Sequence, residues 1–316
     1  MIEQLLRELG ERLGSVCSVT RFAPSSALTT YRVGGPISLL AEVSSLDQLL
    51  GVSSELSTTD VEVLVIGRGS NLLISDAGYD GVVIKLGVGF DDVVCDRDAQ
   101  TVSAGGSVAL PVLARRSATA GLRGLEFFAG IPGSVGGAVR MNAGGHGAET
   151  RDVLLSATLL QLGSQHVTEF HRDRLGFGYR HSALSGREIV IGAVFAAVAG
   201  SAEAASQEID EIVRWRRQHQ PGGQNCGSVF TNPDGDSAGR LIDTCGLKGT
   251  RIGGATVSAK HANFIQAEDG ATADDIFRLI QLVRNTVAES TGLELPVELQ
   301  LVGFEHPTSN DSGVRA

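Results

Sequence analysis

The stretch that decides the fold of this chain reads Gly121-Leu-Arg-Gly-Leu-Glu-Phe-Phe-Ala-Gly-Ile-Pro-Gly-Ser-Val-Gly-Gly-Ala138, and Asn142-Ala-Gly-Gly-His-Gly147 follows it closely. Glycine lacks a Cβ, so it permits backbone conformations closed to other residues and lets the main chain approach a ligand closely. Each glycine also raises the entropy that is lost when the chain becomes ordered. So much bare backbone therefore predicts close contact with a planar ring and its phosphates.

A second glycine loop, Gly67-Arg-Gly-Ser-Asn-Leu72, follows the β-rich run Val61–Ile66. A Gly-x-Gly pair after a strand is typical of Rossmann dinucleotide sites, but Leu72 stands at the third glycine position, and Lys85 lies where such a site needs an acidic residue. The loop is better interpreted as a nest of N–H groups, with its serine and asparagine as further donors to a pyrophosphate. For these residues alone, an ordinary tight turn is the alternative. Together the two loops predict a large cofactor that is gripped from two sides.

The composition is that of a soluble globular protein. At 316 residues the chain is long enough for two or three domains. Hydrophobic residues make up 42% and charged residues 20%, which is ordinary for a soluble protein. The net charge of −10 excludes the general footprint of a nucleic-acid-binding protein. An anionic ligand can still bind where local arginines and backbone N–H groups outweigh the global field.

The chain carries no pattern typical of a membrane, secreted or metal-binding protein. Its apolar runs are too short to span a bilayer, and residues 1–10 form an acidic amphipathic pattern instead of a signal peptide. We therefore predict a cytoplasmic enzyme. Cys17, Cys95, Cys226 and Cys245 form no Cys-x-x-Cys pair and have no histidine at ligand spacing. They are interpreted as reduced thiols, and no metal site is predicted.

Hydrophobic periodicity divides the chain into three regions. The first is predicted to contain a helix over 2–13, a strand over 37–43, a helix over 45–56 and a strand over 61–66. The second is predicted to contain strands at 82–86, 101–104, 153–160 and 189–198, and a helix at 108–120. The third opens with a helix from Ala202 and ends with a helix over 272–290, capped by Thr272 and Gly292, and a strand over 295–302. The tail after Glu305 is predicted to be disordered.

Three short motifs contain polar residues that could carry chemistry. Tyr179-Arg-His-Ser182 places an arginine in a polar connection, and Asn225-Cys-Gly-Ser-Val-Phe-Thr-Asn-Pro233 places a serine at the start of a strand. In Leu295–Leu301, alternation puts Glu298 and Gln300 on the face opposite the apolar residues. Taken singly, these motifs are more typical of a surface ion pair, a turn and a solvated strand position. The serine has no Gly-x-Ser-x-Gly elbow, so a hydrolase triad has little support.

Taken together, the motifs resemble those of the UDP-N-acetylenolpyruvoylglucosamine reductase family over roughly Thr29–Val302. The matching segments are Thr30-Tyr-Arg-Val-Gly-Gly35, Gly67-Arg-Gly-Ser-Asn71, Gly124-Leu-Glu-Phe127, Gly130-Ile-Pro-Gly-Ser-Val-Gly-Gly-Ala138, Tyr179-Arg-His-Ser182, Gly227-Ser-Val-Phe-Thr-Asn-Pro233, Ala238-Gly-Arg-Leu-Ile242 and Val257-Ser-Ala-Lys-His-Ala-Asn-Phe264. So many ordered motifs at family spacing are specific, whereas any one alone would not be.

The resemblance implies an α+β fold, with a two-part FAD-binding domain of the vanillyl-alcohol-oxidase type and a C-terminal α/β substrate-binding domain. The implied units are residues 1–80, 81–200 and 201–304, with a tail over 305–316. It also implies an NADPH-dependent FAD enzyme that converts UDP-N-acetyl-3-O-(1-carboxyvinyl)-glucosamine to UDP-N-acetylmuramate for peptidoglycan. We expect the FAD to be held without a covalent link, and NADPH to use the substrate cleft in turn.

The resemblance also assigns residue roles. Arg180, Ser228 and Glu298 are implied to form the catalytic set. The residues implied to bind the cofactor are Gly67, Arg68, Gly69, Ser70, Asn71, Leu72, Gly130, Ile131, Pro132, Gly133, Ser134, Gly136, Gly137, Asn142 and Gly144. Those implied to contact the substrate are Tyr179, Asn232, His261 and a basic residue at Arg216 or Arg217. Because the next strand pattern follows Arg180 so soon, the chain resembles the shorter branch, which lacks a tyrosine-bearing lid loop.

Two other functions stay open at this point. One is an FAD oxidase or dehydrogenase of the same cofactor fold that acts on an alcohol or a lactone, and which would not need the third region with Ser228 and Glu298. The other is a non-catalytic module that binds a nucleotide sugar. The absorbance of a bound flavin would exclude the second.

Overall fold

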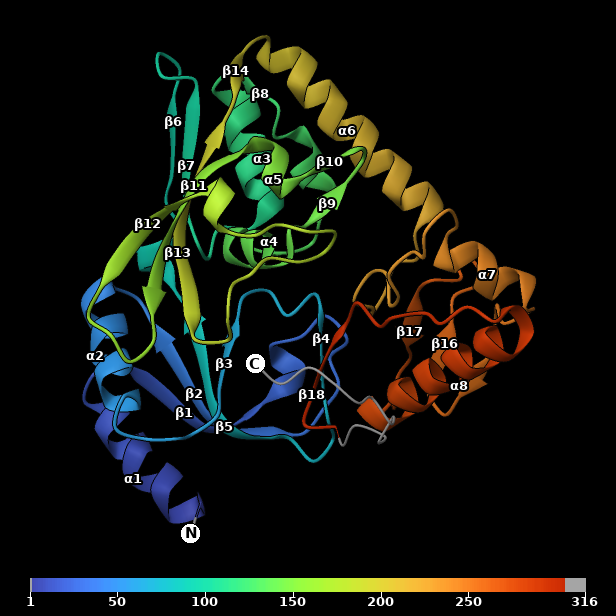
Figure 1. Cartoon of the computed structure of the whole chain (residues 1–316), viewed down its shortest axis with the longest axis horizontal. Coiled ribbons are helices and arrows are strands. Elements are labelled where there is room, and N and C mark those ends of the chain that lie inside the picture. Colours follow the sequence, from blue (N-terminus) through green and yellow to red (C-terminus); the bar gives the residue numbers. More distant parts are fainter. Residues whose placement is uncertain (1, 305–316) are drawn as a thin grey trace.

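The first unit of the fold is a mixed sheet in the order β1-β2-β5-β3, at the lower left of Figure 1. The computed structural model describes residues 2–304 of the chain. The strands are β1 (Ser18–Pro24), β2 (Pro36–Val43), β5 (Tyr79–Leu86) and β3 (Val63–Ile66). Helices α1 (Ile2–Gly14) and α2 (Leu46–Leu56) pack on one face, where Leu9, Leu13 and Leu49 are fully buried in a common core with the strands.

The predicted strand–helix–strand pattern is confirmed in this sheet. Strands β2 and β3 flank α2 along the chain, but they are not neighbours, because β5 lies between them and runs parallel to both. Parallel strands need a long crossover connection, and α2 provides it. The arrangement leaves the loop after β3 free at the edge of the sheet, and this loop is the second glycine loop, Gly67–Leu72.

The second unit is an antiparallel sheet in the order β12-β11-β13-β7-β6, at the upper left of Figure 1. Its strands are β12 (Val167–His171), β11 (Leu154–Gln161), β13 (Glu188–Ala196), β7 (Thr101–Gly105) and β6 (Val93–Asp96). Helix α3 (Leu110–Thr119), helix α4 (Val135–Met141) and the start of α6 (Ala202–His219) share a core with it. Small elements complete this unit: β8 (Leu122–Arg123), β14 (Val198–Ala199), β9 (Gly144–Gly145), β10 (Ala148–Glu149) and α5 (Thr150–Val153).

The main glycine stretch folds into a short 3₁₀ helix, a turn and α4. The 3₁₀ helix covers Glu126–Gly130, and Ser134 caps α4 by accepting a hydrogen bond from the N–H of Gly137. Helix α4 ends at Asn142, whose φ of 43° lies in the left-handed region that few residues other than glycine and asparagine adopt. The stretch that sequence analysis interpreted as one loop is therefore half helical.

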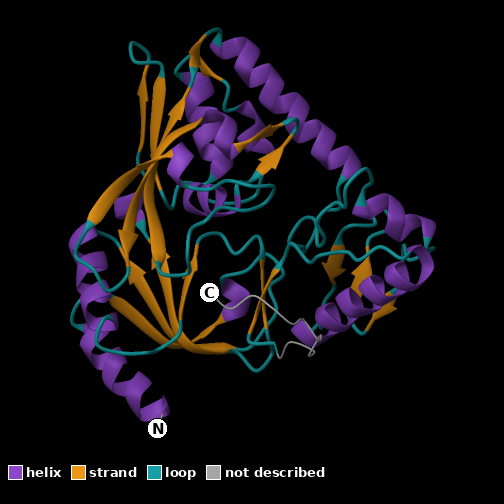
Figure 2. Ribbon diagram, in the orientation of Figure 1, coloured by secondary structure: helices purple, strands orange, loops and turns teal. Residues whose placement is uncertain are grey.

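The third unit lies at the right of Figure 1, and α6 extends from the second unit toward it. It contains α7 (Ala238–Thr244), the sheet β15 (Arg251–Ile252), β16 (Ala255–Val257) and β17 (Ile265–Ala267), and α8 (Ala273–Thr291). Thr272 caps α8 in a reciprocal capping box with Asp275, and Gly292 follows with a φ of 73°. Both predicted caps are confirmed. Figure 2 shows how the helices of this unit cover its short strands.

The last strand is shorter than predicted. Strand β18 covers only Gln300–Val302, and it pairs in parallel with β4 (Leu72–Ile74) of the first unit. Residues 295–298 instead approach the segment after Ser228, where Phe230 and Val297 form an isolated bridge. The strand is short because the chain changes partner here: residues 296–298 bond to the segment after Ser228, whereas Gln300 bonds to Asn71 just before β4. Pro296 also has no N–H to donate to a strand ladder. The chain thus returns from the third unit to the first (Figure 1).

The predicted unit boundaries at 80 and 200 stay predictions. The first sheet includes all of β5, so the change from one sheet to the next occurs between Leu86 and Val93. The predicted disordered tail at 305–316 lies outside the described residues. Within residues 2–304, no helix is both long enough and apolar enough to cross a membrane.

Candidate active site

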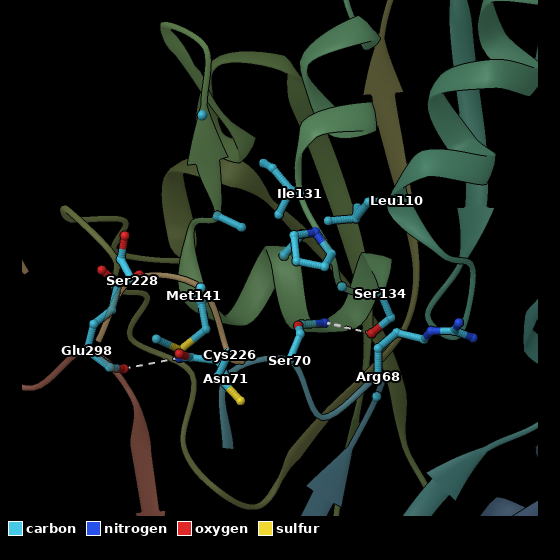
Figure 3. A pocket seen from close by; sticks show the side chains of 18 of the residues that line it. Arg68, Ser70, Asn71, Leu110, Ile131, Ser134, Met141, Cys226, Ser228 and Glu298 are labelled. Carbon is cyan, nitrogen blue, oxygen red and sulfur yellow. Dashed lines mark hydrogen bonds between the residues drawn. The ribbon is translucent and has the colours of Figure 1, made fainter. Parts of the chain in front are cut away.

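A cavity of about 490 Å³ lies where the three units meet. One wall comes from the loop between β3 and β4, a second from the glycine stretch and the β9–β10 hairpin, and the third from the end of α6, the segment around Ser228 and the segment before β18. Figure 3 shows Ser228 and Glu298 toward one end of the cavity and Arg68 toward the other. Segments far apart in the sequence therefore form one site.

Most residues of the two glycine loops line this cavity. The predicted cofactor residues on its walls are Gly67, Arg68, Gly69, Ser70, Asn71, Leu72, Gly130, Ile131, Pro132, Gly133, Ser134, Gly137 and Gly144. Gly136 instead lines a smaller neighbouring cavity of about 130 Å³, which shares Arg68, Ser134 and Gly137 with the first. Asn142 lines neither cavity and is fully buried.

The glycines of the cavity wall are of two kinds. Gly69 has a φ of 60°, and a Cβ there would overlap the carbonyl oxygen of Leu28, so the fold itself requires glycine. At Gly133, Gly137 and Gly145, φ is not positive, and a Cβ would come no closer than 3.4 Å to any described atom other than its chain neighbours. Neither conformation nor packing against the protein requires glycine at these three positions. The space beside them is a cradle that added Cβ atoms would begin to fill.

Ser228 and Glu298 come together through backbone pairing. The N–H of Glu298 donates to the carbonyl of Val229 over 2.8 Å, and the N–H of Thr231 donates to Pro296 over 3.0 Å. The segment before β18 therefore runs beside the segment after Gly227, whose φ of 76° produces the sharp turn before Ser228. Both Ser228 and Glu298 line the cavity (Figure 3).

Arg180 approaches the same end of the cavity from the connection between β12 and β13. Its Nε lies 3.1 Å from Oε1 of Glu298, and both side chains are mostly buried, with exposed fractions of 22% and 16%. Within the described chain this Nε has no hydrogen-bond partner of good geometry, so the contact is an ion pair and not an aligned hydrogen bond. Arg180 also has a φ of 53°, a conformation that a bulky side chain adopts only when its surroundings enforce it.

Burial and charge act in opposite directions on Glu298. Desolvation raises the pKa of this carboxyl, and the neighbouring Arg180 guanidinium lowers it by a smaller amount, so the pKa lies above its ordinary value. Among the described residues that line the cavity, Glu298 is the one carboxylate, whereas Arg68, Arg140, Arg180 and Arg216 are four cations. The cavity is thus locally positive in a chain whose net charge is −10, which favours an anionic ligand.

Few of the residues predicted to contact the substrate line the cavity. Of the two arginines that the sequence left open, Arg216 lines the cavity and Arg217 does not. Tyr179 is half exposed beside the Arg180 guanidinium, Asn232 accepts a hydrogen bond from the N–H of Ala238 at the start of α7, and His261 accepts one from the N–H of Asn263. These last three side chains do not line the cavity, and their assignment stays a prediction.

Sequence reasoning missed several wall residues at the end of α6. Trp215 and Gln220 line the cavity, and the Trp215 ring lies 5.1 Å from the His146 ring and 4.5 Å from the His219 ring. The signal available in the sequence was the single tryptophan of the chain, placed among arginines in Arg214-Trp-Arg-Arg217. Only residues 181–187 separate Arg180 from β13, which leaves no room for a long loop there.

The fold and the cavity define an FAD-binding oxidoreductase with a separate C-terminal domain. Residues 37–168 match the family model described as an FAD binding domain, and residues 218–302 match the C-terminal domain of UDP-N-acetylenolpyruvoylglucosamine reductase. The chain belongs to the UDP-N-acetylenolpyruvoylglucosamine reductase family. The family and the fold class that the motifs predicted are confirmed.

Several relatives support this membership over nearly the whole chain. The reductase of Synechococcus sp. (strain WH7803) is 42% identical over 90% of this chain and 93% of its own, and that of Bacillus subtilis (strain 168) is 38% identical over 96% and 99%. The crystal structure of UDP-N-acetylenolpyruvylglucosamine reductase from Thermus caldophilus superposes with a TM-score of 0.77 at 34% identity, covering 90% of this chain and 98% of that one.

Proposed function

We propose that the protein is an NADPH-dependent FAD enzyme that reduces UDP-N-acetyl-3-O-(1-carboxyvinyl)-glucosamine to UDP-N-acetylmuramate. The observation that carries the proposal is the convergence of Arg180, Ser228 and Glu298 on one glycine-lined, arginine-rich cavity. Full-length relatives that are named for this activity support it. A cytoplasmic location stays a prediction.

The cavity fits FAD on the evidence of its own backbone. Gly133, Gly137 and Gly145 leave main chain bare where the protein itself has no need of it, as a flat ring or a phosphate requires. Arg68 and Arg140 line both the large cavity and its neighbour, so they are placed to neutralise phosphates of an extended cofactor. When bound, FAD supplies the hydride chemistry that no side chain can provide.

Arg180 and Glu298 are proposed to manage the negative charge of the substrate. Addition of hydride to the terminal carbon of the enol ether places charge on the adjacent carbon and its carboxylate. Arg180 can hold that carboxylate with two parallel hydrogen bonds in a largely dry site, where such stabilisation is strongest. A substrate carboxylate that binds Arg180 also weakens the attraction between the guanidinium and the Glu298 carboxylate. It adds a second negative charge close to Glu298. Both effects raise the pKa of Glu298 further and favour its protonated form.

Ser228 is proposed to donate the proton that completes the reduction. Its segment is paired with that of Glu298, so its hydroxyl lies at the same end of the cavity as the ion pair. A serine hydroxyl is a weak acid, but a carbanion is basic enough to take its proton. The alkene thereby gains one hydride and one proton.

The alternative of an alcohol or lactone oxidase on the same cofactor fold is less well supported. Such an enzyme has no need of a third unit that delivers a serine and a buried carboxylate next to an arginine. This chain builds that arrangement from three separate segments.

The deciding experiment is a pair of half-reactions on the purified protein. We expect flavin absorbance, its loss on anaerobic addition of NADPH, and its recovery on addition of the enolpyruvyl nucleotide sugar. Recovery with oxygen or an alcohol-derived product, but not with this substrate, would favour the oxidase. Acid precipitation should release all of the flavin, whereas a yellow pellet would show a covalent link.

A further inference from the structure

We propose that Asn71 and Asn142 are positioning residues that hold the backbones of Glu298 and Arg180, so that the ion pair between them faces the cavity. The inference rests on the proposed function, because it concerns the carboxylate-binding end of that site. Both asparagines belong to glycine-rich segments that resemble cofactor loops, but their side-chain amides are bonded to the catalytic segments instead.

Asn71 connects the cofactor loop to Glu298. Its Nδ2 donates to the backbone carbonyl of Glu298 over 3.1 Å (Figure 3). The backbone carbonyl of Asn71 accepts from the N–H of Gln300 over 3.0 Å. On the other side, the N–H of Glu298 is bonded to Val229. The Glu298 peptide is therefore fixed from both sides, by the segment of Ser228 and by the loop Gly67–Leu72.

Asn142 does the same for the turn that carries Arg180. Its Nδ2 donates to the carbonyl of Gly178 over 2.8 Å and to Oε2 of Glu149 over 2.7 Å, while its Oδ1 accepts from the N–H of Arg151 over 3.0 Å. The turn itself is short, since Gly178 and His181 bond to each other around Tyr179 and Arg180. With both of its protons and its oxygen engaged, the fully buried amide is available to no ligand.

The chemistry of these positions favours asparagine over similar residues. At 142 the side chain must both donate and accept, and the backbone must be left-handed, which asparagine tolerates better than most residues. An aspartate would place a second negative charge against Glu149 and could not donate. The two amides thus hold the backbone on each side of the Arg180–Glu298 ion pair, one at the Glu298 carbonyl and the other at Gly178.

Two substitutions remove the amides while leaving the hydrogen bonds made by the backbone of residues 71 and 142 in place. Asn71→Ala keeps the carbonyl that pairs with Gln300, and Asn142→Gly keeps the left-handed turn that ends α4. Asn285→Ala, at an exposed position of α8 that does not line the cavity, is the control. The assays are anaerobic flavin reduction by NADPH, single-turnover flavin reoxidation by the enolpyruvyl nucleotide sugar, and flavin content per chain.

We expect each substitution to slow the maximal rate of reoxidation by about 10- to 100-fold, the scale on which small misplacement of reacting groups acts. Reduction by NADPH and flavin content should change far less than reoxidation. The thermal midpoint should fall in Asn142→Gly, because Gly178, Glu149 and Arg151 each lose a hydrogen-bond partner. Asn285→Ala should match the wild type in all assays. Equal losses in both half-reactions, or loss of flavin, would show that the asparagines support the fold or the cofactor. Wild-type reoxidation rates in both variants would also overturn the inference. If the wild-type protein itself were not reoxidised by this substrate, the proposed function would fail instead.

Discussion

The substitution Gly137→Ala tests whether the fold or the cofactor requires glycine at position 137. Gly137 is the third residue of α4, its φ is not positive, and the nearest described atom to an added Cβ, chain neighbours aside, is Oγ of Ser134 at 3.5 Å. The protein alone has room for the methyl group. Because alanine loses less conformational entropy than glycine in a helix, we expect the cofactor-free protein to become more stable by about 0.5–1 kcal/mol.

The same methyl group faces both cavities, which Gly137 lines together with Arg68 and Ser134. Extra atoms in a well-packed contact typically cost about 1–3 kcal/mol. At about 1.4 kcal/mol per factor of ten, FAD should bind about 5- to 150-fold more weakly. One substitution should therefore raise the stability of the cofactor-free protein and lower its affinity for the cofactor.

The assays are urea denaturation of the cofactor-free protein and titration of flavin fluorescence as FAD binds. Gly14→Ala is the matched control, because Gly14 is an exposed helical glycine at the end of α1 whose Cβ would meet no described atom within 4 Å. It should gain stability without a change in FAD affinity. Unchanged FAD affinity in Gly137→Ala would refute the cradle, and a large loss of stability would show that the glycine serves the fold.

Four further outcomes follow from the site. Arg180→Lys keeps the charge but loses the planar fork, so flavin reoxidation by substrate should fall far more than reduction by NADPH. Ser228→Ala should slow reoxidation by about 10²- to 10⁴-fold with little change in substrate affinity, and Ser228→Cys should recover part of the rate. A wild-type rate in Ser228→Ala would show that the serine only contacts the substrate and donates no proton. The proposed role requires protonated Glu298, so reoxidation should fall as pH rises through the raised pKa of this carboxyl, and Glu298→Gln should remove that pH dependence. Tyr31→Phe should leave the free energy of unfolding unchanged or raise it by up to about 1 kcal/mol in urea denaturation. The reason is that the fully buried Tyr31 hydroxyl has no hydrogen-bond partner among residues 2–304. A decrease of about 1 kcal/mol in stability would instead reveal a buried water bonded to the hydroxyl.

The sequence predicted those elements whose structure depends on residues close together in the chain. The 272–290 helix was predicted with both of its ends, because capping is decided within a few residues. The alternation in 295–301 placed Glu298 and Gln300 on one face, and both side chains do line the cavity although the strand itself covers only 300–302. The side chains of 295–301 still alternate between two faces, because the backbone stays extended while it bonds first to Val229 and then to Asn71.

What local patterns could not predict is which distant segments meet. The return of β18 to β4 places Asn71 against Glu298, 227 residues apart in the sequence, and no periodicity reports such a contact. Asn142 shows the same limit, since its place in a glycine-rich motif suggested a cofactor contact whereas its amide is bonded to Gly178. Motif membership shows that a residue belongs to a site, but the hydrogen bonds show to which part of the site it belongs.

The cavity places two opposite requirements on the backbone, which has to be bare at the cofactor and fixed at the charged pair. A flat cofactor requires bare, closely approaching main chain, and glycine-rich main chain is easily displaced because it loses so much entropy when ordered. A charge-stabilising pair requires fixed positions, since Arg180 and Glu298 meet at 3.1 Å in a largely buried site. The chain has one asparagine in or beside each glycine loop, and its amide is bonded to the segment of a residue proposed to be catalytic. The side-chain amides of these two asparagines thereby add to the backbone pairing of Glu298 with Val229 and of β18 with β4, which already joins the third unit to the first.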